Sequence, residues 1–152
     1  MNIIKRYWRI VFPALFAIVI WAFSSANGAA SQETSQWVSS IFGIPNPLMR
    51  KLAHFGLFAG FGFSISSFFK GLEPNAFPNL TSTIYAIVIP VAYAAIDEVH
   101  QLAIAGRNGS VADVFLDALA GVFGVCAYIA IFCFFHQSQI KELLRRKNKI
   151  WH

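Results

Sequence analysis

Residues 111–135, VADVFLDALAGVFGVCAYIAIFCFF, form an apolar run in which only Asp113 and Asp117 carry a charge. A helix of about 20 predominantly apolar residues crosses the hydrocarbon core of a bilayer, so this run predicts a tilted membrane-spanning helix. The apolar residues are continuous and do not alternate with polar ones. This pattern favours a helical membrane protein over a β-barrel.

Three further apolar runs precede this one, at about 10–23, 48–69 and 80–103. The composition agrees, because 57% of the residues are hydrophobic and 12% are charged, whereas soluble domains carry about 25% charged residues. We therefore predict an all-α integral membrane bundle of about four transmembrane helices. The 152 residues suit a single domain, with a core over about 10–135 and a basic tail over 136–152.

Between the first two runs, residues 31–49 are polar and predict an exposed loop. Trp37, Ile41 and Phe42 predict a short amphipathic segment of this loop at the membrane interface. The first run has basic residues before it and small residues after it, which is also typical of a signal peptide cleaved near Ala30. An uncleaved signal-anchor helix is favoured, because the rest of the chain is itself a membrane bundle.

The net charge of +5 is concentrated at the two ends of the chain. Lys5, Arg6 and Arg9 precede the first apolar run, and Lys and Arg are frequent again after residue 140. This distribution is typical of topology signals and of contacts with membrane lipids, and it disfavours nucleic-acid binding. Four spans put both termini on one side. The positive-inside rule then predicts a multi-pass protein of the inner (cytoplasmic) membrane with both termini in the cytoplasm.

Ionisable side chains gather where three of the predicted helices reach the outer face of the membrane. Such groups are costly inside or beside a bilayer, so their convergence predicts a functional site. Lys51 and His54 are three residues apart, and Asp97 and Gln101 are four apart, so each pair shares a helix face. The complete set comprises Arg50, Lys51, His54, Asp97, Glu98, Gln101, Arg107, Asp113 and Asp117.

Small residues predict how the helices pack. Asp113, Asp117, Gly121 and Gly124 follow one stripe of the last helix, which should face the bundle interior. A G-x-x-x-G pattern at 56–60 predicts a second close approach between helices, because small residues let two backbones come together.

The residue types allow two chemistries at the predicted site. General acid/base catalysis needs a proton carrier beside a carboxylate, and the catalytic candidates are His54, Asp97 and Glu98. Alternatively, the cations can bind a phosphate or carboxylate. The ligand-binding candidates are Arg50, Lys51, Gln101, Arg107, Asp113 and Asp117.

Both readings have a structural alternative. Ser110 and Asp113 match a capping box at the start of the last helix. Asp117 can be bridged to Lys51 or Arg107 in a network that only stabilises the fold.

A metal centre is disfavoured by the sequence. His54, Asp97, Glu98 and His100 are suitable ligand types, but the chain has no H-E-x-x-H or H-x-x-x-H pattern and no cysteine ligand set. The nearby Lys and Arg side chains would repel a cation. We therefore expect no metal ion and no other cofactor.

Several of these residues form blocks that resemble a known family. Lys51-Leu52-Ala53-His54 is followed about forty residues later by the block DEVHQ at 97–101 and then by GRNGS at 106–110, Asp113 and Asp117. These blocks are similar to those of the VanZ-like family of small bacterial membrane proteins, named after a teicoplanin-resistance determinant, and the resemblance covers about residues 10–135. It implies the fold, the site and a lowered susceptibility to a glycopeptide antibiotic.

The chain departs from the family pattern just after His54. Many relatives carry a Glu and an aromatic hydroxyl where this chain has Leu57 and Phe58. A mechanism that needs a second proton carrier there is therefore disfavoured.

The function that we expect is binding of an anionic envelope or lipid-linked ligand in an outward-facing polar pocket, linked to glycopeptide tolerance. One alternative is a membrane enzyme that performs acid/base chemistry on a lipid headgroup. Another is a structural partner subunit without a ligand. A pocket that is open favours the first two, whereas a closed and fully paired network favours the third.

Overall fold

The structure is a computed structural model that describes residues 3–26, 28–72, 78–107 and 109–137. Most of the predicted basic tail, 136–152, lies outside these residues. The described residues form five α-helices and contain no strand. The helices are α1 (Ile3–Ser25), α2 (Gly28–Phe42), α3 (Asn46–Leu72), α4 (Leu80–Leu102) and α5 (Val111–Phe135).

Three of these helices, α3, α4 and α5, are long and apolar enough to cross a membrane. In α1 the stretch Arg9–Ser25 is also apolar. The predicted all-α membrane bundle is therefore confirmed. It consists of three helices that are long and apolar enough to cross a membrane, and of the apolar helix α1 at the place of the first predicted span.

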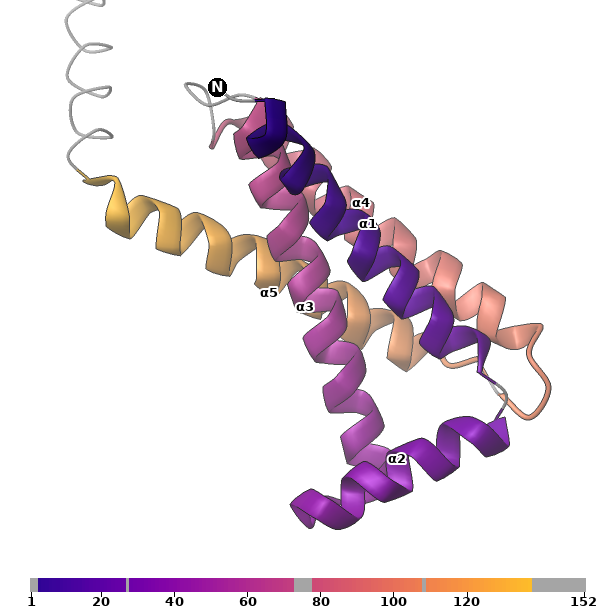
Figure 1. Cartoon of the computed structure of the whole chain (residues 1–152). Helices are drawn as coiled ribbons and strands as arrows, with labels where there is room; N and C mark the ends of the chain where they lie inside the picture. Colours follow the sequence, from indigo (N-terminus) through magenta and orange to yellow (C-terminus); the bar gives the residue numbers. More distant parts are fainter. Residues whose placement is uncertain (1–2, 27, 73–77, 108, 138–152) are drawn as a thin grey trace, which may run out of the picture.

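Helix α2 occupies most of the segment that was predicted as an exposed loop. It lies crosswise beneath the ends of α1 and α3 (Figure 1). Its apolar residues Trp37, Ile41 and Phe42 are all exposed, as expected of an amphipathic segment. The chain then turns into α3 at Gly43, whose φ of 67° lies in the left-handed region that glycine adopts without strain.

Helix α3 crosses α5 at very short range (Figure 1). A Cβ added to Gly62 would collide with the backbone carbonyl of Gly121, and one added to Gly124 would collide with that of Ala59. The predicted inward stripe of α5 is therefore confirmed at both glycines. Packing of this kind replaces the hydrophobic driving force that helices lack in a lipid environment.

The second close approach predicted for the G-x-x-x-G pattern of α3 is confirmed at Gly60, where α1 is the neighbour, and not at Gly56. A Cβ at Gly60 would meet the ring of Phe16 on α1, and a Cβ at Gly56 would have no described atom within 4 Å. The crossing of α3 with α5 uses a different face of α3, which carries Ala59 and Gly62 opposite Gly124 and Gly121.

Large apolar side chains point outward along the spans. Phe115, Leu119 and Phe123 of α5 are each more than half exposed, whereas Ala120 and Val125 are fully buried. In a bilayer the exposed face contacts lipid chains, so bulky residues outside and small residues inside are the expected arrangement. Asp117 lies one turn before Gly121 on the inward stripe, and the fold therefore carries its carboxylate into the interior.

Candidate functional site

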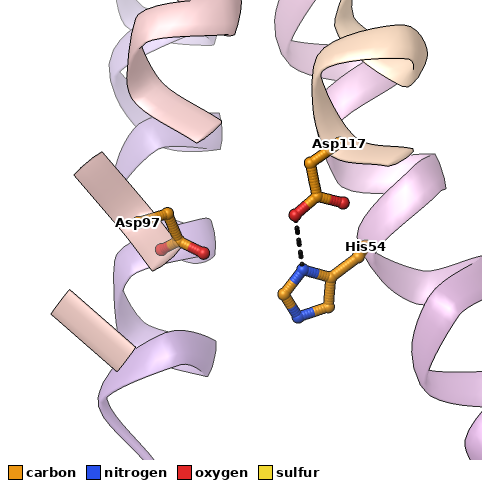
Figure 2. A group of neighbouring side chains, drawn as sticks. All are labelled: His54, Asp97 and Asp117. Atoms are coloured by element: carbon orange, nitrogen blue, oxygen red, sulfur yellow. Dashed lines mark hydrogen bonds and ion pairs between the residues drawn. The ribbon is translucent and has the colours of Figure 1, made fainter. Parts of the chain in front are cut away.

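The site is built around a contact between α3 and α5. His54 Nδ1 lies 3.0 Å from Asp117 Oδ2, and the two atoms form a hydrogen bond (Figure 2). Asp117 is 1% exposed, so the imidazole is its direct partner in an apolar setting. The predicted bridge from Asp117 to Lys51 is wrong, because Lys51 pairs with Asp113 instead.

Helix α4 adds a second buried carboxylate to this contact. Asp97 is fully buried, and its Oδ2 accepts a hydrogen bond of 2.8 Å from Gln101 Nε2. The predicted shared face of these two residues is therefore confirmed. Asp97 also faces the His54–Asp117 pair, and one nitrogen or oxygen atom of each of the three side chains lies within 4.8 Å of the others (Figure 2). We call His54, Asp97 and Asp117 the carboxylate–histidine cluster.

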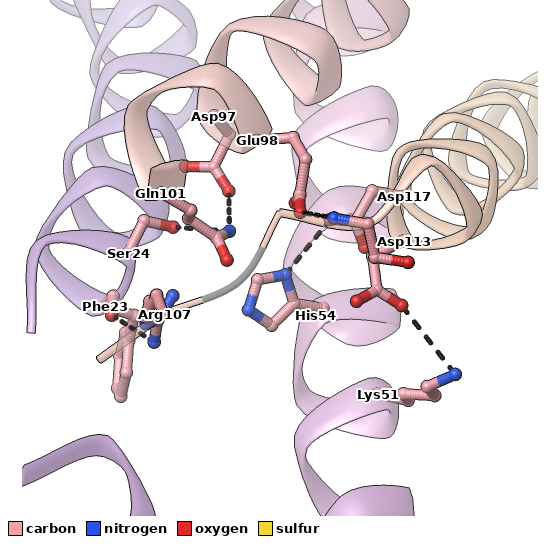
Figure 3. Close-up of polar contacts among 11 residues, drawn as sticks. Phe23, Ser24, Lys51, His54, Asp97, Glu98, Gln101, Arg107, Asp113 and Asp117 are labelled. Carbon is pink, nitrogen blue, oxygen red and sulfur yellow. Dashed lines mark hydrogen bonds and ion pairs between the residues drawn. The ribbon is translucent and has the colours of Figure 1, made fainter. Parts of the chain in front are cut away.

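Glu98, the neighbour of Asp97, has a different partner. Its Oε1 accepts a hydrogen bond from the backbone N–H of Ser110, the N-cap residue of α5 (Figure 3). Within the described residues the Ser110 side chain makes no capping bond, so the predicted capping box with Asp113 is wrong. A carboxylate from the preceding helix takes the cap N–H and ties the end of α4 to the start of α5.

Asp113 faces outward, so the predicted inward stripe of α5 is wrong at this residue. It pairs with Lys51 Nζ at 3.7 Å, with side-chain exposures of 57% for Lys51 and 40% for Asp113. An exposed pair of this kind is worth less than about 1 kcal/mol. These two residues therefore stand at the edge of the site and not within it.

Arg107 connects the α4–α5 turn to α1. The turn contains Gly106, whose φ is 76°. The Nη2 atom of Arg107 donates a hydrogen bond of 3.1 Å to the backbone carbonyl of Phe23 on α1. Burial lowers the pKa of the Arg107 guanidinium, and the positive charge of Arg50 lowers it further, while the carboxylates of Asp97 and Glu98 oppose the shift.

A cavity of about 690 Å³ opens beside these two arginines. Its wall is mostly apolar, and His54 joins Arg50 and Arg107 as its charged or ionisable groups. The lining comes from α1, α2, α3 and the α4–α5 turn: Ala22, Phe23, Ala26, Thr34, Ser35, Val38, Met49, Arg50, Leu52, Ala53, His54, Gly56, Leu57 and Arg107.

The contribution of α1 was missed by the sequence analysis. Ser24 is fully buried, and its Oγ accepts a hydrogen bond of 3.4 Å from Gln101 Nε2. Figure 3 shows Ser24 and Phe23 beside Gln101 and Arg107. The one available signal was the short polar ending of the first apolar run, which is also typical of a signal peptide and so did not point to a site.

The fold and these contacts thus define a helical membrane protein that has a polar site at one end of its bundle. The sequence profile of the VanZ/LLP1 family matches residues 9–136. The chain therefore belongs to the VanZ/LLP1 family, and the resemblance inferred over residues 10–135 is confirmed. Comparisons with curated proteins and with solved structures found no match.

Proposed function

We propose that this protein binds an anionic amphiphile, which is a molecule with a phosphate or carboxylate group on a hydrocarbon or isoprenoid chain. The observation that carries this proposal is the cavity that combines an apolar wall with the guanidinium groups of Arg50 and Arg107. Its volume of about 690 Å³ lies within the range of about 300–1,000 Å³ that is usual for small-molecule sites.

The charges of the cavity favour an anion. Arg50 and Arg107 both line the cavity, so an anionic group there would meet two positive charges. Guanidinium groups bind phosphate and carboxylate through paired N–H donors, which makes arginine well suited to such a site. Leu52, Leu57 and Val38 offer the apolar surface that a lipid chain would cover.

The same proposal accounts for a link to glycopeptide tolerance. With the termini in the cytoplasm, the cavity would face outward, where lipid-linked precursors and anionic envelope lipids are exposed. Holding such a molecule would change what teicoplanin meets at the membrane surface. Family membership supports this link.

A second candidate function is acid/base catalysis on the headgroup of the bound amphiphile. The specific observation in its favour is that His54 lines the cavity and is hydrogen-bonded to Asp117 behind it. A carboxylate in this position orients the imidazole and stabilises its charged form, as general acid/base catalysis requires. A purely structural network is disfavoured by the open cavity next to the paired groups.

The binding proposal is tested with dodecyl phosphate as the probe and dodecanol as its uncharged counterpart, added to the full-length protein in a mild detergent. Native mass spectrometry or calorimetry then measures binding. Arg50→Gln and Arg107→Gln should each weaken dodecyl phosphate binding by about tenfold or more, because a hydrogen bond to a charged group is worth roughly 1.5–3 kcal/mol.

The matched control is Lys51→Gln, which removes a neighbouring cation that contacts Asp113. Its affinity for dodecyl phosphate should stay that of the wild type. Equal binding of dodecanol and dodecyl phosphate, or equal losses in all three variants, would argue against an anion site at the arginines. In a glycopeptide-susceptible host, the two arginine variants should also lose any tolerance that the wild type confers at matched expression.

A further inference from the structure

We propose that the carboxylate–histidine cluster binds one divalent transition-metal cation, with His54, Asp97 and Asp117 as its three protein ligands. This site does not rest on the proposed binding of an amphiphile, because its ligands do not include Arg50 or Arg107 and it is tested with the metal alone.

The geometry of the cluster is that of a nearly assembled site. Three helices each contribute one side chain, and one potential ligand atom of each side chain lies within 4.8 Å of the other two (Figure 2). Ligand atoms of tetrahedral zinc lie about 2.0–2.2 Å from the metal, and so roughly 3.3–3.6 Å apart. The widest pair therefore needs to close by at most roughly 1–1.5 Å, which side-chain torsions can supply.

The buried oxygens are an independent indication of a ligand. Asp97 is 0% exposed and Asp117 is 1% exposed. The Oδ1 atom of each is buried and has no hydrogen-bond partner among the described residues. A carboxylate oxygen that is buried without a partner is costly, and two in one cluster are more so. A cation held by the two carboxylates would compensate their buried negative charge and would replace the proton that His54 shares with Asp117.

The sequence disfavoured a metal because of nearby cations, but Lys51 and Arg107 each have a partner outside the cluster. Lys51 contacts Asp113, and the Arg107 Nη2 atom donates to the Phe23 carbonyl. The hydrogen bond from Gln101 to Asp97 is the kind of outer contact that orients a metal-binding carboxylate.

The ligand set indicates which cation would bind. One imidazole and two carboxylates suit Zn²⁺ or Mn²⁺, whereas Ca²⁺ and Mg²⁺ prefer oxygen ligands alone. Three protein ligands leave at least one coordination position open, which is typical of zinc sites that bind a water or a substrate. His54 also lines the cavity, so the open position can be reached from there.

The test uses the full-length protein in detergent, stripped with a chelator and titrated with Zn²⁺ by calorimetry. The wild type should bind one equivalent. Asp97→Asn and Asp117→Asn should each weaken binding by roughly 100-fold or more, because even the loss of a residue that only orients a ligand weakens it by about 10–100-fold. Asn has nearly the same shape as Asp and removes a buried charge, so both variants should fold.

The matched control is Glu98→Gln, which alters the adjacent buried carboxyl outside the cluster. Its affinity for Zn²⁺ should remain that of the wild type. A second measurement needs no variant: Co²⁺ bound to the wild-type protein should give an absorption spectrum of nitrogen and oxygen ligands. A thiolate charge-transfer band would assign the ion to Cys126 or Cys133 and overturn the proposal. Absence of stoichiometric binding, or Zn²⁺ affinity that survives both Asp substitutions, would overturn it as well.

Discussion

Substitution of Gly62 by alanine tests the helix crossing on which the site depends. A Cβ at this position would collide with the carbonyl of Gly121 and stand 3.2 Å from its Cα. The obstacle is backbone, which no rotamer change can remove, so α3 and α5 must move apart. Overpacking of this kind costs about 1–3 kcal/mol. Replacing glycine by alanine within a helix stabilises the helix by up to about 1 kcal/mol, which partly offsets this cost.

Gly56→Ala is the matched control on the same helix. A Cβ there has no described atom within 4 Å, so the variant gains the same helix propensity without the collision. The difference between the two variants therefore isolates the strain, about 1–3 kcal/mol, which is roughly a 5- to 150-fold change in the folded-to-unfolded ratio.

Reversible unfolding by SDS in mixed micelles measures both free energies of unfolding. Gly62→Ala should also weaken Zn²⁺ binding, because moving α5 away from α3 lengthens the His54–Asp117 contact. A Gly62→Ala protein as stable as Gly56→Ala would refute the close crossing.

Three smaller perturbations have expected outcomes of their own. Lys51→Ala should change the free energy of unfolding by less than about 1 kcal/mol, because its ion pair is exposed; a clear loss of folded protein in size-exclusion chromatography would contradict this. Glu98→Ala leaves the Ser110 N–H without its acceptor and should destabilise the protein by about 1–3 kcal/mol, whereas Glu98→Gln keeps an acceptor oxygen and should cost less in the same SDS unfolding assay. Single cysteines at Gln36 and Lys147, in a cysteine-free background, should react with an impermeant thiol reagent from opposite sides of the membrane; reaction of both from outside would reject the predicted topology.

Hydropathy predicted the long helices because a bilayer demands a fixed apolar length. The runs at 48–69, 80–103 and 111–135 correspond to α3, α4 and α5 within a few residues at each end. Helix α2 was predicted mostly as loop, because its polar sequence carries no such length signal.

Sequence also predicted the depth of the polar residues along each helix, and with it their convergence at one end of the bundle. It did not predict which partner each would find. Lys51 and His54 share a face of α3, yet Asp117 contacts His54, and Lys51 turns to Asp113. That choice depends on the rotation of α5 against α3, which the backbone contact at Gly62 and Gly121 determines. A glycine pattern indicates that helices can approach closely, but it does not specify the neighbour.

The tight crossing and the polar site are consequences of the same stripe of α5. Gly121 and Gly124 let this helix press against α3, and Asp117 precedes Gly121 by four residues, or about 6 Å along the axis. The approach that the glycines allow is therefore what brings the Asp117 carboxylate to His54. Within the described residues, His54 is the one member of the carboxylate–histidine cluster that also lines the cavity. A cation in the cluster and an amphiphile in the cavity would contact the same imidazole, so the binding of one should change the affinity for the other.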